Sequence, residues 1–302
     1  MTGRNPVCKL SARNWLLVAI SFLNIVPVSA QQLANYTQYM NNGTPYNSGF
    51  SLINKSSDIT LSGKIQWAGI DGAPQSFLLN GNLQLAGLKA STGLVIRQDK
   101  FGSDNQSSAS LFFAKAVAIT ASTFLASSAH IGFETFNGSY SQLDPTDPLF
   151  RNDINVTSAT VGIGVLLYNP DKFYIGVAMP SLRIGPSRFG PSSTLYISAG
   201  YLYEIDYKLA IKPSVLISYA SKIPATADIS TTLYLGTLGL GAGFNTNKEA
   251  AGIFSYHVSN IKMGYSYRTS LSNQVIGGIS TGTHELSVGF YLGKNKIAKV
   301  QL

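Results

Sequence analysis

The chain has 302 residues and a formal charge of +8, and only 12% of its residues are charged whereas 45% are apolar. Soluble domains carry about twice this share of charged residues, so the composition excludes the charged surface of an ordinary cytosolic protein. Beyond the N-terminal region, no apolar run reaches the roughly 18 residues of a membrane-spanning helix, which excludes a polytopic helical membrane protein. The remaining classes are a secreted all-β protein and an outer-membrane β-barrel.

Residues 1–30 have the pattern of a secretory signal peptide. A basic region precedes an apolar stretch, Trp15–Val26, which is too short to cross a bilayer. Small residues lead up to Ala30, after which we expect cleavage. A buried core helix is the alternative interpretation of the apolar stretch. The single cysteine, Cys8, lies in the part that cleavage would remove, so the mature chain is predicted to have no disulfide.

A polar segment, residues 31–57, follows the expected cleavage site. It carries the aromatic residues Tyr36, Tyr39, Tyr46 and Phe50, and aromatic side chains are enriched at protein interfaces. We interpret it as an N-terminal periplasmic or plug segment, with Tyr36 and Tyr39 as candidate partner contacts. A segment that binds a partner, one that plugs a lumen and one that frays in the periplasm all remain open at this point.

Apolar and polar residues alternate through most of the region 58–292. Along 58–69, for example, apolar Ile59 and Leu61 alternate with polar residues such as Ser62. This period of two is typical of a strand with one apolar and one polar face. Fourteen strands are expected, at 58–69, 76–87, 91–98, 107–117, 121–133, 156–168, 173–180, 194–204, 207–219, 226–235, 237–245, 249–256, 260–268 and 283–292.

The gaps between these strands alternate in length. Every second gap is short, and longer gaps rich in Gly, Pro, Ser, Asn and Asp are expected at 99–106, 134–155, 181–193 and 269–282. Outer-membrane barrels have short periplasmic turns and longer external loops. The sequence therefore favours a transmembrane antiparallel β-barrel of about 14 strands, with lipid on its apolar face, over a secreted sandwich. Residues 293–302 are expected to form a basic C-terminal tail.

Residues that could support catalysis or bind a metal do not cluster in the sequence. His130, His257 and His284 lie in different expected strands or turns, without metal-ligand spacing. There is no nucleophile elbow, phosphate loop or dinucleotide fingerprint, and no basic run interleaved with aromatic residues that would indicate nucleic acid. We predict a protein with no enzymatic activity, cofactor or metal. A serine–histidine pair assembled in space stays the alternative.

Two stretches carry the features of a known family. The first is Tyr36-Thr37-Gln38-Tyr39-Met40-Asn41, followed by Pro45-Tyr46-Asn47-Ser48-Gly49. The second is Gln66-Trp67-Ala68-Gly69-Ile70-Asp71-Gly72-Ala73-Pro74-Gln75, with Trp67, Asp71 and Pro74 as its motif residues. Together they resemble the PorP/SprF family, membrane proteins of the type IX secretion system. The chain departs from the family at Pro45-Tyr46-Asn47, where proline–alanine–tyrosine is usual, and in the tail after the last strand.

The resemblance implies an integral barrel of the bacterial outer membrane without catalytic activity. It implies a role in the export or surface attachment of proteins with C-terminal sorting domains, such as gliding adhesins. The implied partners are outer-membrane lipid, other type IX secretion components and a secreted protein with a C-terminal sorting domain. The residues alone lead only to a barrel, and they leave open an outer-membrane porin or small-molecule transporter and a secreted β-structured adhesin.

Overall fold

The computed structural model describes residues 35–141, 143, 152–185, 193–221, 223–271 and 282–292. The predicted signal peptide and basic tail lie outside the described residues. The strands are β1 (Ser57–Ile65), β2 (Gln75–Leu85), β3 (Ala90–Phe101), β4 (Asp104–Ala118), β5 (Phe124–Gly138), β6 (Ile154–Asn169), β7 (Phe173–Arg183), β8 (Thr194–Tyr201), β9 (Tyr203–Asp206), β10 (Leu209–Ala220), β11 (Ile223–Leu235), β12 (Leu238–Asn245), β13 (Glu249–Val258), β14 (Ile261–Ser270) and β15 (Thr283–Leu292). Two short 3-10 helices are also described, η2 (Ser48–Leu52) and η3 (Ala86–Leu88).

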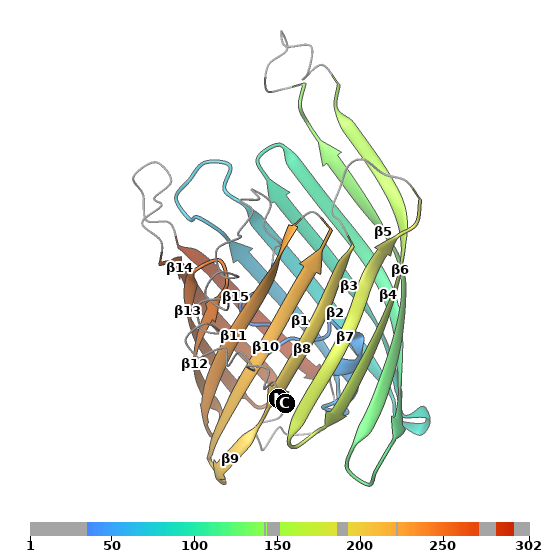
Figure 1. Ribbon diagram of the computed structural model, residues 1–302, viewed down its shortest axis with the longest axis vertical. Coiled ribbons are helices and arrows are strands. Elements are labelled where there is room, and N and C mark those ends of the chain that lie inside the picture. Colours follow the sequence, from blue (N-terminus) through green and yellow to red (C-terminus); the bar gives the residue numbers. More distant parts are fainter. Residues whose placement is uncertain are drawn as a thin grey trace, which may run out of the picture.

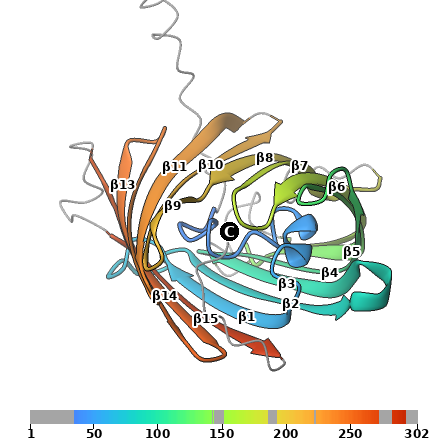
Figure 2. The same ribbon diagram turned by 90° about the horizontal axis from the view of Figure 1, so that it is seen from below.

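The strands form one closed antiparallel sheet. Apart from β8 and β9, each strand pairs with its neighbours in the chain, and β1 pairs with β15, which closes the barrel (Figures 1 and 2). Strand β9 continues β8 beyond Leu202, and the two pair with successive parts of β10. The fifteen strands therefore occupy fourteen positions in the wall. This confirms the predicted antiparallel barrel of fourteen strands and excludes the sandwich.

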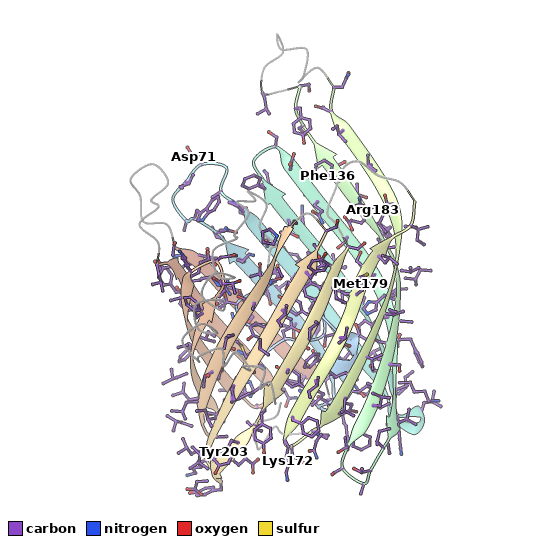
Figure 3. All side chains as sticks on the ribbon, in the orientation of Figure 1. Asp71, Phe136, Lys172, Met179, Arg183 and Tyr203 are labelled. Atoms are coloured by element: carbon purple, nitrogen blue, oxygen red, sulfur yellow. The ribbon has the colours of Figure 1, made fainter. Side chains whose placement is uncertain are left out.

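The apolar face of each strand points outward. Ile131 and Ile163, in the middle of the wall, are 67% and 72% exposed, whereas inward-facing Ser62 and Asn80 are buried. Figure 3 shows side chains projecting from the outside of the wall along its height. A water-soluble protein would have the opposite arrangement, and a transmembrane barrel presents its apolar band to lipid. Among the described residues, no helix is long and apolar enough to cross a membrane.

The connections have different lengths at the two ends of the barrel. The end with turns 86–89, 119–123, 170–172, 207–208, 236–237 and 259–260 has only short connections. The opposite end has the longer connections 66–74, 139–153, 184–193 and 271–282, together with the short turns 102–103, 221–222 and 246–248. Following the rule for such barrels, we call the first end periplasmic and the second end outer.

The prediction of a long gap at 99–106 was wrong. Strands β3 and β4 continue to Phe101 and from Asp104, and they are joined by a tight turn in which Gly102 has a φ of +54°. Strands β5 and β6 likewise extend into the gap expected at 134–155. These strand ends carry polar residues on both faces, so their sequence lost the alternation by which a strand is recognised.

Candidate functional site

The N-terminal segment lies inside the barrel. Figure 2 shows this segment, in blue, running through the ring of strands before the chain enters β1. We call residues 35–56 the plug segment. Tyr36, Tyr39 and Tyr46 are 3%, 5% and 2% exposed, so the structure places both candidate contacts of this segment, Tyr36 and Tyr39, within the lumen. Their role as partner contacts and the domain boundaries stay predictions.

Charged side chains of the wall hold the main chain of the plug segment. Glu285 in β15 accepts hydrogen bonds from the backbone N–H groups of Thr37 at 2.7 Å and Gln38 at 3.1 Å. Lys64 in β1 donates to the carbonyl oxygen of Asn35 at 3.3 Å. Hydrogen bonds with one ionised partner are about twice as strong as neutral ones. The wall therefore recognises this part of the segment through its backbone.

Two more lysines hold the plug segment closer to the periplasmic end. Lys212 in β10 donates to the carbonyl oxygen of Met40 at 3.0 Å, and Lys262 in β14 donates to that of Asn41 at 2.9 Å. Lys212 is only 1% exposed, and a buried ammonium without partners is strongly destabilising. The carbonyl oxygens replace the water that the lysines lose, so the plug segment and the wall stabilise each other.

Tyr39 and Tyr46 of the plug segment have polar partners for their hydroxyl groups, whereas the Tyr36 hydroxyl has none among the described residues. The Tyr39 hydroxyl lies 2.9 Å from the carbonyl oxygen of Ser214 and 3.0 Å from the hydroxyl of Ser230. The Tyr46 hydroxyl accepts a hydrogen bond from the backbone N–H of Tyr36 at 2.8 Å. Buried tyrosines usually satisfy their hydroxyl in this way. The rings of Tyr39 and Tyr46 therefore contribute buried area without leaving these two hydroxyls unpaired.

Asn47 fits against two glycines of the wall. Its side-chain nitrogen donates to the carbonyl oxygen of Val165 at 2.9 Å, and its side-chain oxygen accepts from the N–H of Gly49 at 3.0 Å and caps η2. A Cβ atom on Gly164 would lie 2.9 Å from the Asn47 oxygen, and one on Gly176 would lie 2.9 Å from its nitrogen. The absence of side chains at these positions in β6 and β7 makes room for Asn47.

The second family-like stretch forms a loop at the outer end, between β1 and β2. The N–H of Gln66 donates to the carbonyl oxygen of Pro74 at 2.9 Å, which closes the loop. Within it, Trp67 and Ile70 each begin a turn whose third residue is a glycine, Gly69 or Gly72, with φ of +97° or +74°. A type II turn requires a positive φ at this position, and glycine adopts it without steric cost.

This outer loop connects neighbouring parts of the rim. The N–H of Ala68 donates to the carbonyl oxygen of Gly282 at 3.1 Å, and the carbonyl oxygen of Gly72 accepts from Gly102 at 3.2 Å. Asp71 is exposed and lies at the outer end of the barrel (Figure 3), whereas Trp67 and Pro74 are half-buried. The structure therefore places Trp67, Asp71 and Pro74 in one loop at the outer end, and Tyr36 and Tyr39 inside the lumen. Their contact with a partner stays a prediction.

Ion pairs line the outer half of the lumen. Arg268 lies 3.0 Å from Asp228 and 3.3 Å from Glu249, and Arg183 lies 2.9 Å from Glu134. In the part of the chain that the structure describes, no group of three or more His, Cys, Asp and Glu residues could hold a metal ion. Sequence reasoning missed these charges and those that hold the plug segment. The only feature of the sequence that could have indicated these lumen charges was the presence of charged residues on the polar face of expected strands.

Known proteins give one family match and several distant structural similarities. The model of the family described as "Type IX secretion system membrane protein PorP/SprF" matches residues 28–290. No curated protein matches the chain. Among solved structures, the outer membrane protein Omp33 of Acinetobacter baumannii has 11% identity and a TM-score of 0.47, covering 78% of this chain and 99% of that one. The toluene transporter TodX of Pseudomonas putida has 10% identity and a TM-score of 0.47, covering 78% of this chain and 89% of that one. The toluene transporter TbuX of Ralstonia pickettii has 9% identity and a TM-score of 0.47, covering 78% of this chain and 88% of that one.

The structural similarities are too distant to carry an argument about function, whereas the family match covers the plug segment and nearly all of the barrel. It confirms the resemblance recognised in the sequence. Together with the closed barrel and its apolar outer face, it assigns the protein to the bacterial outer membrane and implies association with other type IX secretion components. The chain belongs to the PorP/SprF family of type IX secretion system membrane proteins.

Proposed function

We propose that this barrel supports the export or surface attachment of a protein with a C-terminal sorting domain, and that it does so without conducting solutes. The plug segment carries this proposal. Its main chain is bound by charged side chains from β1, β10, β14 and β15, namely Lys64, Lys212, Lys262 and Glu285, and Asn47 is fitted against β6 and β7. A segment held by charged side chains of four strands and by the amide of Asn47 is a constitutive part of the barrel.

Outside the lumen, the surfaces left for partners are the two rims and the lipid-facing wall. At the outer rim, the loop with Trp67, Asp71 and Pro74 is shaped by its own backbone and presents an acidic side chain to solvent. Such a loop on a rigid scaffold is where binding residues are commonly found. We infer that a secreted partner, for example a gliding adhesin, or another type IX component contacts this loop, and that the protein acts by binding and has no catalytic role.

Deletion of the gene tests the proposal against the porin alternative. The cargo to follow is a large secreted protein with a C-terminal sorting domain. We expect its transcript to be unchanged while the protein disappears from the cell surface and either accumulates inside or escapes to the medium. The purified full-length barrel should show no steady conductance in a planar bilayer. Unchanged surface cargo together with clear ion conductance would make the porin the better account.

A further inference from the structure

A polar cavity of about 100 Å³ lies in the lumen beside the plug segment. Its lining comes from β3, β4, β5, β7 and β8, and Pro45 of the plug segment closes part of it. Glu134 and Arg183 of the lining are close to the outer ends of their strands, and Figure 3 shows Arg183 near the upper end of β7. The cavity therefore lies in the outer half of the lumen, and a ligand would enter it from outside the cell.

The cavity contains one more positive than negative charge among its lining residues. Arg183 is paired with Glu134 at 2.9 Å. Arg97 in β3 has no hydrogen bond and no ion pair to any residue that the structure describes, although Tyr196, Asp99 and Glu134 are close enough to interact with it electrostatically. A guanidinium presents a planar fork of donors that matches a carboxylate. Arg97 is the residue of the cavity with donors to spare.

His130 in β5 gives a second, independent indication of a ligand. It lines the cavity and is only 6% exposed, and neither of its ring nitrogens has a hydrogen-bond partner among the described residues. Its ring packs 5.8 Å from that of Phe112. Most buried polar groups in native proteins are hydrogen-bonded, and an unpaired one is destabilising by about 1–3 kcal/mol. A ligand in the cavity would supply the missing partner.

We propose that this cavity binds a carboxylate that enters from the outside. Arg97 would donate to the two carboxylate oxygens, His130 would donate through one ring N–H, and the hydroxyls of Ser108 and Ser110 complete a polar lining. A cavity of about 150 Å³ can hold benzene, so this smaller one takes a group of the size of a carboxylate on a short side chain. The carboxylate belongs either to a small organic acid or to an acidic side chain of a peptide. This site goes beyond the proposed export role and does not depend on it.

The histidines provide a direct test because the chain has only three. The full-length barrel is labelled with 15N-histidine in detergent micelles, and the His130 signals are assigned with His130→Gln. Sodium acetate and the blocked peptide Ala-Glu-Ala are titrated separately, with acetamide and blocked Ala-Gln-Ala as neutral controls. We expect a saturable shift of the His130 signals with a carboxylate probe, no shift of the His257 and His284 signals, and no effect of the neutral probes.

Arg97→Gln should weaken binding of the carboxylate probe by at least about tenfold, because it removes a bidentate charged contact. Lys100→Gln is the matched control, since it removes a positive charge from the same strand but from an exposed side chain, and it should bind as the parent does. Different mobility of unheated and boiled samples verifies that both variants fold. Binding of the peptide alone identifies a peptide ligand, and binding of acetate as well identifies the carboxylate group itself. No saturable shift with either probe, or equal binding by Arg97→Gln, would overturn the proposal.

Discussion

The plug segment and the outer loop 66–74 carry the two clearest similarities to the family, yet they are held in opposite ways. The main chain of the plug segment is bound by charged side chains of the wall, such as Glu285 and Lys212. The outer loop is closed by hydrogen bonds between its own backbone groups, and its tip residue Asp71 is exposed. The plug segment therefore depends on the barrel wall for its conformation, whereas the turns of the loop form through its own backbone and the loop adds two backbone hydrogen bonds to the rim. A family-like motif can thus mark internal packing in one place and a presented surface in another.

Removing the plug segment should produce the largest effect. Deletion of residues 35–47 takes away the carbonyl groups bound by Lys64, Lys212 and Lys262 and exposes these lysines to the lumen. We expect the deletion variant to conduct ions and to prefer anions. The three lysines outnumber Glu285 and Asp228, the acids that lose plug contacts in the same deletion, and an excess of one charge raises the local concentration of the opposite ion. Single-channel recordings in planar bilayers with a salt gradient measure both properties.

The full-length barrel is the control for this deletion and should remain silent. Replacing the three lysines by glutamine in the deletion variant should abolish the preference for anions while conductance remains. A deletion variant that folds, as judged by its heat-dependent gel mobility, but does not conduct would show that the plug segment is not what closes the lumen.

Filling the space reserved for Asn47 should have a smaller effect than the deletion, but it should still lower the stability of the whole barrel. In Gly164→Ala the added methyl group would lie 2.7 Å from the Ser128 hydroxyl and 2.9 Å from the Asn47 oxygen. Overpacking of this kind typically destabilises a protein by about 1–3 kcal/mol. Gly63→Ala is the matched control, because a Cβ there meets nothing within 4 Å. The midpoint of unfolding in urea should fall for the first variant and stay near the parent value for the second. Equal midpoints would mean that the plug segment adjusts freely.

The fold could be predicted from the sequence because a barrel wall repeats one simple rule. Alternation along residues such as Ile59, Leu61 and Ile65 determines which face meets lipid, and thirteen neighbouring pairs then follow from the chain order. The rule fails where both faces meet water. Strand β5 was expected to end at 133 but continues to Gly138, since its outer end lies beyond the apolar band and loses the contrast between faces.

The candidate site was harder to predict because its contacts join residues far apart in the chain. Thr37 and Glu285 are 248 positions apart, and nothing near either residue indicates the hydrogen bond between them. The sequence did identify Tyr36 and Tyr39 as residues that need a partner surface, and a plug was one of the interpretations left open. It could not identify which surface, since aromatic residues are common both in buried cores and at protein interfaces. Trp67, Asp71 and Pro74 were recognised through the family resemblance alone.

Changing the tip of the outer loop should affect partners and leave the barrel intact. Asp71 is exposed, so Asp71→Asn removes a charge without changing the turn, and the stability of the barrel should stay within about 0.5 kcal/mol of the parent. Surface cargo should fall severalfold if the loop contacts a partner through this carboxylate. Gly72→Ala is the comparison variant, because its φ of +74° strains any other residue and distorts the turn itself. Normal surface cargo in Asp71→Asn with a loss in Gly72→Ala would assign the motif to loop shape alone.

The smallest effect is expected at the base of the connection between β5 and β6. The backbone N–H of Ser141 donates to the Asp153 carboxylate at 2.9 Å, and this hydrogen bond holds the pKa of the exposed carboxyl below its usual range. The contact therefore exists above the pKa of Asp153 and is lost as the pH falls through it. In Asp153→Ala, protease added to intact cells should cut the connection modestly faster at neutral pH, since the hydrogen bond between Ser141 and residue 153 at its base is gone. Asp153→Asn keeps an acceptor oxygen and should be cut at nearly the parent rate. If cutting in every variant required a permeabilised outer membrane, the two ends of the barrel would be inverted, and the outer loop with Asp71 would face the periplasm.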